Sequence, residues 1–276
     1  MKKIVIFLGF CIILFVAFVY LNRTNETIVY YYNKFRNVHD IRERLLSELR
    51  PVTLDNCTLK RYGAPDDGGY LMCANLMSDS KSAYSYGIDG RDEWGCDVAT
   101  FRSIPLHQYD CFNLTRTVCK NAELHFNEEC IGGTDEIIEG RIFNTLTTQI
   151  NKNNDQNKQL VVKMDIEGAE WDSILATSNE ILNNISQFVI EFHWANSEKH
   201  IRTIRKLKET FYIAHVHFNN NGCTRHAYPM PSEVYEVLFV NKKIGVIDPN
   251  APTPKFPNSL DSPNNKNLPD CQYNWE

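Results

Sequence analysis

The pattern of apolar and polar positions from about residue 52 onward predicts a domain in which strands and helices alternate. Runs of apolar residues predict strands over 82–88, 106–110, 122–131, 159–165, 186–193, 211–218 and 235–241. Apolar positions at helical spacing predict helices over 92–102, 143–152, 168–182 and 197–210. No helical pattern separates the last two strands, so we expect them to pair antiparallel as a long hairpin. This alternation is typical of a doubly wound α/β domain.

The N-terminus has a different pattern, an uncharged apolar run from Ile4 to Leu21. As a helix this run would rise about 27 Å, which is close to the thickness of a bilayer core. Two lysines precede the run and no A-x-A cleavage site follows it, which favours an uncleaved signal anchor over a cleaved signal peptide. We therefore expect residues 1–3 in the cytoplasm, a transmembrane helix over 4–21, and the rest of the chain in the lumen.

The remaining segments flank the domain, which we place at 52–248. Residues 22–51 are predicted to form a stem whose last part is a helix that ends before Pro51. Its apolar positions at helical spacing are Ile41, Leu45, Leu46 and Leu49. The tail over 249–276 carries six of the eleven prolines and many asparagines. It is predicted to be an irregular wrap or linker, tied back through Cys271.

Charge and cysteine content restrict the partners and the compartment. The formal net charge of −5 argues against a nucleic-acid binder, which usually has a basic face. Of nine cysteines, Cys11 lies in the apolar run. The other eight are Cys57, Cys73, Cys96, Cys111, Cys119, Cys130, Cys223 and Cys271. This even set without a C-x-x-C spacing predicts disulfides in an oxidising compartment, although the sequence does not choose the pairing.

Acceptor triplets for N-glycosylation agree with a lumenal domain. They begin at Asn22, Asn25, Asn56, Asn113 and Asn184. With the signal anchor and the cysteines, they predict a single-pass type II membrane glycoprotein of the secretory pathway. A short span followed by a stem favours the Golgi.

Two consecutive strand-to-helix junctions carry residues suited to a cofactor. The first junction has Gly87, Asp89 and Gly90, where glycines would let the backbone approach a ligand closely. The spacing differs from the G-x-G-x-x-G dinucleotide fingerprint. Asp110 ends the next strand, where a carboxylate is well placed to accept hydrogen bonds from ribose hydroxyls. An ordinary loop glycine and a turn-forming aspartate are the alternatives.

The fourth and fifth strands end in ionisable residues. Asp165 stands at the tip of the strand over 159–165, and a strand-tip carboxylate has no reason of core packing to be there. Glu191 and His193 project to one face of the next strand, because side chains alternate with period two. Together these three predict an acid/base or metal cluster. Glu170 is interpreted as a carboxylate that stabilises the start of the following helix.

The motifs, taken in order, resemble the FkbM-related, methyltransferase-like family, which has membrane-anchored lumenal members. They are RYGAPDDGGYLMC, YSYGIDGRDEWGCDVA, HQYDCFN, VVKMDIEGAEWDSIL, QFVIEFHW and AHVHFNNNGC. The resemblance spans about 55–245, and KMDIEGAEW is its most specific element. It implies a Rossmann-like class I methyltransferase sheet, five mainly parallel strands plus an antiparallel final pair, that binds S-adenosylmethionine.

Carried over to this sequence, the resemblance implies a role for each candidate residue. Gly87 and Gly90, with Asp89 between them, would line the methionine and ribose end, Asp110 would hold the ribose, and Asp165 would border the transfer site. The first motif departs from the family pattern, because Tyr86-Gly87-Ile88-Asp89-Gly90-Arg91 replaces the usual acidic-x-Gly-x-Gly-x-Gly.

These observations predict an S-adenosylmethionine-dependent O-methyltransferase acting on a glycan or another acceptor of the secretory pathway. His193 and Asp165 are the candidate bases, with Glu191 orienting. Asp165 and Glu191 offer two oxygen ligands for a divalent metal, but no metal is expected. One alternative is a lumenal glycosyltransferase in which Asp165-Ile166-Glu167 acts as a D-x-D motif. Another is a lumenal domain that keeps the fold without catalysis.

Overall fold

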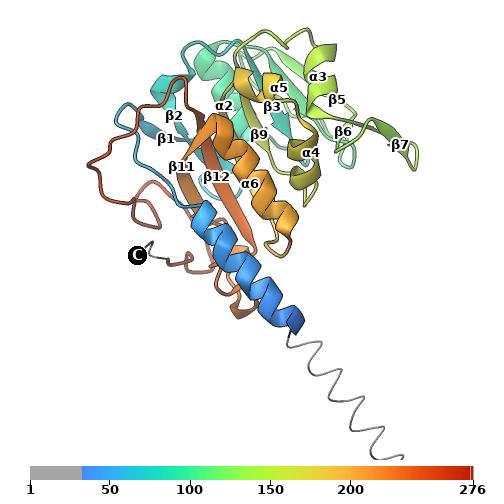
Figure 1. Ribbon diagram of the computed structural model, residues 1–276. Helices are drawn as coiled ribbons and strands as arrows, with labels where there is room; N and C mark the ends of the chain where they lie inside the picture. The colour runs from blue at the N-terminus through green and yellow to red at the C-terminus, as the bar shows by residue number, and fades with distance from the viewer. Residues whose placement is uncertain (1–32, 274, 276) are drawn as a thin grey trace, which may run out of the picture.

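A seven-stranded mixed sheet forms the centre of the computed structural model, which describes residues 33–273 and 275 (Figure 1). The predicted cytoplasmic residues 1–3 and the predicted transmembrane helix over 4–21 lie outside the described residues. Within the described part of the chain, no helix has both the length and the apolar character needed to cross a membrane.

The strand order confirms the predicted sheet. Its strands are β3 (Ser82–Tyr86), β4 (Leu106–Tyr109), β5 (Leu124–Asn127), β9 (Leu160–Met164), β10 (Ile185–His193), β11 (Phe211–Phe218) and β12 (Val234–Asn241). They are arranged in the order β11-β12-β10-β9-β3-β4-β5. The five strands from β5 to β10 run parallel, and β12 pairs antiparallel with both β10 and β11. The α/β fold is thus a mixed sheet with antiparallel final strands, as in a class I methyltransferase.

Helices cover one face of the sheet, and one helix with a hairpin covers the other (Figure 1). The first face carries the helix over residues 33–48, α3 (Leu146–Lys152), α4 (Glu170–Ala176), α5 (Asn179–Asn184) and α6 (Glu198–Thr210). The second carries α2 (Glu93–Arg102) and the hairpin of β1 (Leu59–Gly63) and β2 (Gly69–Cys73). Strand residues divide between the two cores with period two: Val162 and Met164 belong to the first core and Val161 to the second.

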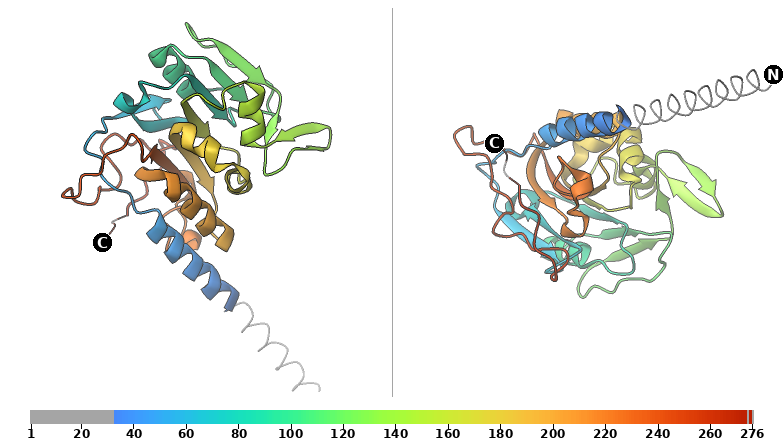
Figure 2. Two further views of the ribbon diagram at one scale, coloured as in Figure 1. Left: turned by 45° about the horizontal axis from the view of Figure 1, so that its top comes forward. Right: turned by 90° about the horizontal axis from the view of Figure 1, so that it is seen from below.

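The helix predicted before Pro51 is confirmed, and it packs on the domain. Its four apolar positions are buried in the first core, with Leu45 and Leu49 fully inaccessible. Glu48 pairs with Arg205 and Lys208 of α6, each at 2.7 Å. The helix therefore lies against α6, as Figure 2 shows, and from residue 33 onward the predicted stem is part of the folded body.

Two predicted elements are divided in the structure. The expected strand over 122–131 is wrong as one element, because it splits into β5 of the main sheet and β6 (Cys130–Ile131) of a small second sheet. That sheet also contains β7 (Glu136–Ile138) and β8 (Arg141–Asn144), which form a protruding hairpin (Figure 2). The expected helix over 168–182 is two helices, because Ser178 caps the start of α5 through the Ile181 amide. Short 3-10 helices are η1 (Ala74–Met77), η2 (Asn220–Gly222) and η3 (Arg225–Ala227).

All eight cysteines outside the N-terminal run form disulfides, as expected. The pairs are Cys57–Cys73, Cys96–Cys119, Cys111–Cys130 and Cys223–Cys271. The last pair ties the tail to the connection between β11 and β12, so the predicted link through Cys271 is confirmed. Four disulfides are consistent with a secreted or lumenal domain.

Candidate functional site

A cavity of about 460 Å³ opens at the carboxyl ends of β3, β4 and β9. At this place the strand order switches sides, because β4 and β5 follow on one side of β3 and β9 and β10 on the other. Ligands bind at this point in open α/β sheets. Six carboxylates line the cavity: Asp67, Asp89, Asp110, Glu129, Asp165 and Glu167. No lysine, arginine or histidine is among the described residues of the lining. Lys152 and Lys163, outside the lining, pair with Glu129 and Asp165. The cavity is therefore acidic through its other carboxylates, and its volume suits a small-molecule ligand.

Gly87 lies in the cavity wall, but the sheet itself also requires this glycine. Its φ is +71°, and a Cβ built there would lie 1.6 Å from the backbone oxygen of Asp165. A side chain at Gly87 would therefore separate the tips of β3 and β9. Gly90 is not part of the lining, and a Cβ there would meet Thr115 at 3.0 Å. The structure thus brings Gly87 and Asp89 to the cavity and leaves Gly90 in the loop behind them.

Asp110 organises the loops beside the cavity. Its Oδ2 accepts a hydrogen bond from the Asp89 amide at 2.9 Å. Its Oδ1 accepts from the amides of Phe112, at 2.9 Å, and Asn113, at 3.0 Å. An ionised carboxylate has about four acceptor positions, so a ligand hydroxyl can still bind here. The predicted ribose-binding role and the turn-forming role are therefore compatible in the same side chain.

Asp165 is held by two residues that the sequence analysis did not single out. Tyr70 of β2 donates its hydroxyl to Asp165 Oδ2 at 3.2 Å, and Lys163 Nζ lies 3.4 Å from the same oxygen. Lys163 Nζ also donates to the backbone oxygens of Gly87, at 2.8 Å, and Tyr86, at 3.2 Å. Burial and the charge of Asp165 raise the pKa of Tyr70 well above its ordinary value, so Tyr70 stays protonated and donates. A lysine inside an apolar strand was the available signal for Lys163.

Glu170 and His193 form a hydrogen-bonded pair next to Asp165. Glu170 Oε1 lies 3.0 Å from His193 Nδ1, and it also accepts from the amides of Ile166, at 3.0 Å, and Gly168, at 3.1 Å. Glu170 is fully buried. The predicted stabilisation of the helix start is therefore accompanied by a second contact, which fixes His193 with Nδ1–H donating and Nε2 free.

Carboxylates surround the free nitrogen of His193. Nε2 lies 3.4 Å from Glu167 Oε2, 3.7 Å from Glu191 Oε1 and 4.0 Å from Asp165 Oδ1. Burial would lower the pKa of His193, but the hydrogen bond and charge of Glu170, with the charges of Asp165 and Glu167, raise it above its ordinary value. The structure thus brings together Asp165, Glu191 and His193, which were predicted as a cluster.

Glu191 is buried in a negatively charged environment. It stands opposite Glu236 in the register of β10 and β12, and its side chain receives a hydrogen bond from Asn219 at 3.4 Å. Burial, with the charges of Asp165, Glu236 and Asp67, raises the pKa of Glu191 well above its ordinary value. This shift favours the protonated form of Glu191 over the carboxylate.

Asp165, Glu170 and His193 each offer one atom to a common metal ion, with these atoms within 4.8 Å of one another. Carboxylate oxygens with an imidazole nitrogen would suit a divalent transition metal. However, Glu170 Oε1 already accepts three hydrogen bonds, and Lys163 places a positive charge beside Asp165. These contacts favour a hydrogen-bonded pair over a metal centre.

Comparison with known proteins adds little to this site. No family model and no curated protein sequence matches the chain. A similar solved structure is a tryptophan-to-alanine mutant of the 16S rRNA (adenine(1408)-N(1))-methyltransferase from Catenulisporales acidiphilia. The sequence identity is 10%, the alignment covers 73% of this chain and 100% of that chain, and the TM-score is 0.26. A TM-score this low does not establish a shared fold.

The strand order and the cavity therefore define the structural class of this protein. This is a protein with a Rossmann-like, methyltransferase-type sheet and an acidic cavity at its switch point. The predicted membership of the FkbM-related family stays a prediction.

Proposed function

We propose that the protein is an S-adenosylmethionine-dependent O-methyltransferase. The observation that carries this proposal is the cavity at the tips of β3, β4 and β9, lined by six carboxylates and by none of the basic side chains in the described chain. The cofactor carries a sulfonium, an ammonium and a carboxylate, which give it a net positive charge, and its ribose presents hydroxyl donors. A cavity of negative charge and acceptor oxygens matches the two cationic groups and the hydroxyls.

The same cavity argues against the glycosyltransferase alternative. A sugar nucleotide carries a negatively charged diphosphate, which proteins usually bind with basic side chains, backbone amides or a metal ion. Asp165 and Glu167 do face the cavity, as a D-x-D motif would require. Because the described lining has six carboxylates and no basic side chain, the cavity disfavours a diphosphate unless a metal ion binds with it.

In this proposal each residue has a distinct role in methyl transfer. S-adenosylmethionine, when bound, supplies the methyl group. Asp110 and Asp89 bind at the ribose end, and Asp165 borders the transferred group. His193 Nε2 takes the proton that leaves the acceptor hydroxyl, and Glu170 holds the imidazole in the required tautomer. Tyr70 and Lys163 fix Asp165 in place.

The acceptor is proposed to be a glycan or another hydroxyl-bearing molecule of the secretory pathway. The four disulfides support an oxidising compartment, and this compartment is rich in carbohydrate. A type II membrane topology through residues 4–21 and residence in the Golgi belong to the same proposal.

Ligand binding tests the proposal. The full chain, produced in an oxidising secretory host and solubilised in mild detergent, is heated with S-adenosylmethionine, with S-adenosylhomocysteine, or with UDP-sugars and manganese. A ligand at 100 times its Kd stabilises the folded state by about 2.7 kcal/mol, or roughly 5–10 °C in Tm. We expect such a shift with the adenosyl ligands, undiminished by EDTA and reduced in Asp110→Ala.

Other outcomes separate the alternatives. A shift only with UDP-sugar and manganese would replace methyl transfer by glycosyl transfer. A folded protein that responds to none of the ligands would favour the non-catalytic domain. A shift with S-adenosylmethionine that EDTA abolishes would assign a metal to Asp165 and His193.

A further inference from the structure

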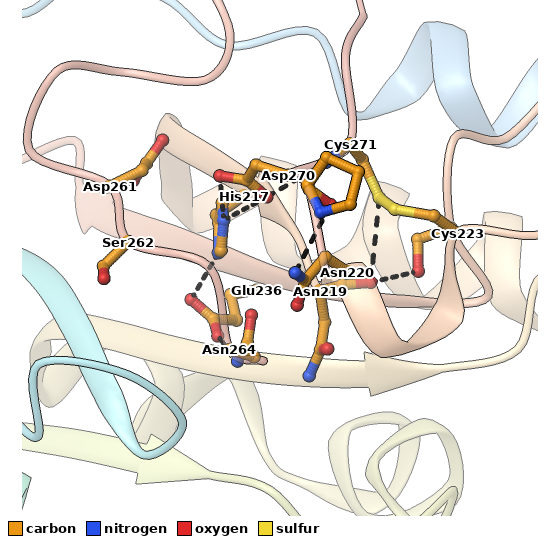
Figure 3. Close-up of polar contacts among 12 residues, drawn as sticks. His217, Asn219, Asn220, Cys223, Glu236, Asp261, Ser262, Asn264, Asp270 and Cys271 are labelled. Atoms are coloured by element: carbon orange, nitrogen blue, oxygen red, sulfur yellow. Dashed lines mark hydrogen bonds and ion pairs between the residues drawn. A yellow bond between two sulfur atoms is a disulfide. The ribbon is translucent and has the colours of Figure 1, made fainter. Parts of the chain in front are cut away.

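The C-terminal tail crosses the turn between β1 and β2 and the ends of β11 and β12. Lys266 Nζ pairs with Asp66 at 2.7 Å, and Ser262 donates to the backbone oxygen of Pro65 at 2.6 Å. On the other side, Asn220 donates to the backbone oxygen of Asn265 at 2.9 Å. The Cys223–Cys271 disulfide, shown in Figure 3, closes the tail covalently. The tail is thus bonded to both the hairpin and the sheet.

Asn264 lies at the centre of these contacts and reaches the cofactor cavity. Its side chain is 7% exposed, and its Nδ2 donates to Asp67 Oδ1 at 2.9 Å and to Glu236 Oε1 at 2.8 Å. Asp67 is part of the cavity lining. A residue of the tail therefore contacts a carboxylate that a bound ligand would also contact, although the two lie far apart in the sequence.

Glu236 gives Asn264 a rigid attachment. Glu236 Oε2 lies 3.2 Å from His217 Nδ1, and His217 Nε2 lies 3.2 Å from Asp270 (Figure 3). Burial would lower the pKa of His217, but the charge of Glu236 and the hydrogen bonds of Asp270 and Glu236, with the charge of Asp261, raise it to about 10. His217 is therefore a buried cation between two carboxylates, and the group that holds Asn264 is itself held on both sides.

Asp67 gains its orientation from this attachment. Asp67 lies in an exposed turn. Among the described residues, the side chain that forms a hydrogen bond with Asp67 is that of Asn264. A free aspartate in a turn samples several rotamers, which reduces the favourable interaction with a ligand charge. The bond from Asn264 uses one oxygen of Asp67 and leaves the other for the cavity.

We infer that Asn264 is a positioning residue that orients Asp67 toward the positively charged part of the cofactor, so that the tail completes the cofactor site. This inference rests on the proposed function. The competing explanation is that Asn264 only attaches the tail, and that Asp67 contributes nothing to ligand binding.

A double-mutant cycle tests the inference in the full chain. The Kd of S-adenosylmethionine is measured by isothermal titration calorimetry for the wild type, Asn264→Ala, Asp67→Ala and the double variant. A hydrogen bond to a charged group that is lost from a binding site weakens binding by about tenfold. We expect each single change to raise the Kd about tenfold and the double variant to match Asp67→Ala, because both changes remove the same oriented carboxylate.

Asn265→Ala is the matched control. Asn265 belongs to the same tail and donates to Asn221 at 3.0 Å, away from the cavity lining. We expect Asn265→Ala to lower stability toward urea while leaving the Kd unchanged. If Asn264→Ala does not fold, Asn264→Ser, which keeps a short hydroxyl donor, replaces it in the cycle.

The outcomes separate this inference from the proposed function. Wild-type protein that does not bind the cofactor overturns both. Wild-type protein that binds, with losses that add in the double variant or with wild-type affinity in Asn264→Ala, overturns the inference alone.

Discussion

At the scale of single residues, the orientation of His193 depends on a side chain whose sequence context indicated a different role. Glu170 lies in the first turn of α4, where a carboxylate stabilises a helix start, and it accepts the Ile166 and Gly168 amides. The hydrogen bond to His193 Nδ1 arises only because β10 brings His193 beside that turn. Period-two alternation correctly placed Glu191 and His193 on one face of the strand. It could not predict that the start of a helix elsewhere in the chain would contact His193.

The variant Glu170→Gln tests the function of this pair. The glutamine side chain can still accept a hydrogen bond from His193 Nδ1, but it lacks the charge that raises the pKa of His193. Because His193 must be neutral to accept a proton, we expect the rising limb of the pH profile of kcat/KM to move to lower pH. We also expect the plateau to fall about tenfold, because a weaker base takes the proton less readily.

The pH dependence of stability provides a second readout for Glu170→Gln. A histidine whose pKa is raised on folding contributes stability below its unfolded pKa, and this contribution is lost as pH rises through the folded pKa. The variant should lose less stability than the wild type over that range. Asp172→Asn, on the exposed side of α4, should leave both profiles unchanged. An unmoved rising limb in Glu170→Gln would argue against His193 as the base.

At the scale of elements, the tips of β3 and β9 approach so closely that they restrict the residue type. The Asp165 amide donates to the Tyr86 oxygen at 3.2 Å, and Gly87 passes directly over the Asp165 carbonyl. A glycine at the first strand tip was predicted as a cofactor turn. In the structure its close contact is with the neighbouring strand.

Gly87→Ala should destabilise the sheet strongly. The left-handed backbone alone costs a non-glycine residue about 1–2 kcal/mol, and overpacking against the Asp165 carbonyl adds about 1–3 kcal/mol. Gly140 is the control, because its φ is +79° and a Cβ there would meet nothing within 4 Å. We therefore expect urea unfolding to show a loss of about 3 kcal/mol for Gly87→Ala and about 1 kcal/mol for Gly140→Ala. Equal losses would contradict the packing explanation.

At the scale of the whole molecule, two segments from opposite ends of the described chain, the N-terminal helix and the tail, both pack on the domain. Their apolar and asparagine-rich patterns predicted a helix and an irregular wrap, and both are confirmed over the described residues. The prediction missed what these segments touch. The helix over residues 33–48 enters the first core, and the tail reaches the cavity through Asn264.

Removing the tail disulfide should affect both stability and ligand binding. The Cys223–Cys271 bond spans 48 residues of sequence, and closing a loop of that length stabilises a protein by about 4 kcal/mol in the chain-entropy model. We expect Cys223→Ser with Cys271→Ser to lower the free energy of unfolding by about that amount. The Kd of S-adenosylmethionine should also rise, because Asn264 loses its covalent anchor.

The disulfide at the other end of the hairpin provides the comparison. Cys57–Cys73 spans 16 residues, for which the same model gives about 3 kcal/mol. The pair Cys57→Ser with Cys73→Ser should therefore lower stability while leaving the Kd nearly unchanged. A rise in Kd of equal size for both pairs would mean that general loosening of the fold, and not release of the tail, weakens binding.

The sequence by itself determined the elements and their order. Apolar periodicity, helix caps and glycine positions act over a few residues, so the main strands, the antiparallel final pair and an even set of cysteines in disulfides could all be predicted. Asp110, Asp165, Glu191 and His193 could be predicted as candidate residues for the same reason, because each lies at or near the end of a recognisable strand.

The tertiary structure alone decided which segments meet. It placed β6 outside the main sheet, chose one of many cysteine pairings, and joined Glu170 to His193, Tyr70 to Asp165 and Asn264 to Asp67. Such contacts depend on how all the layers pack at once, and no local pattern encodes them. The acidic cavity is of this kind, since its carboxylates come from the hairpin, from three strand tips of the main sheet and from the segment before β6.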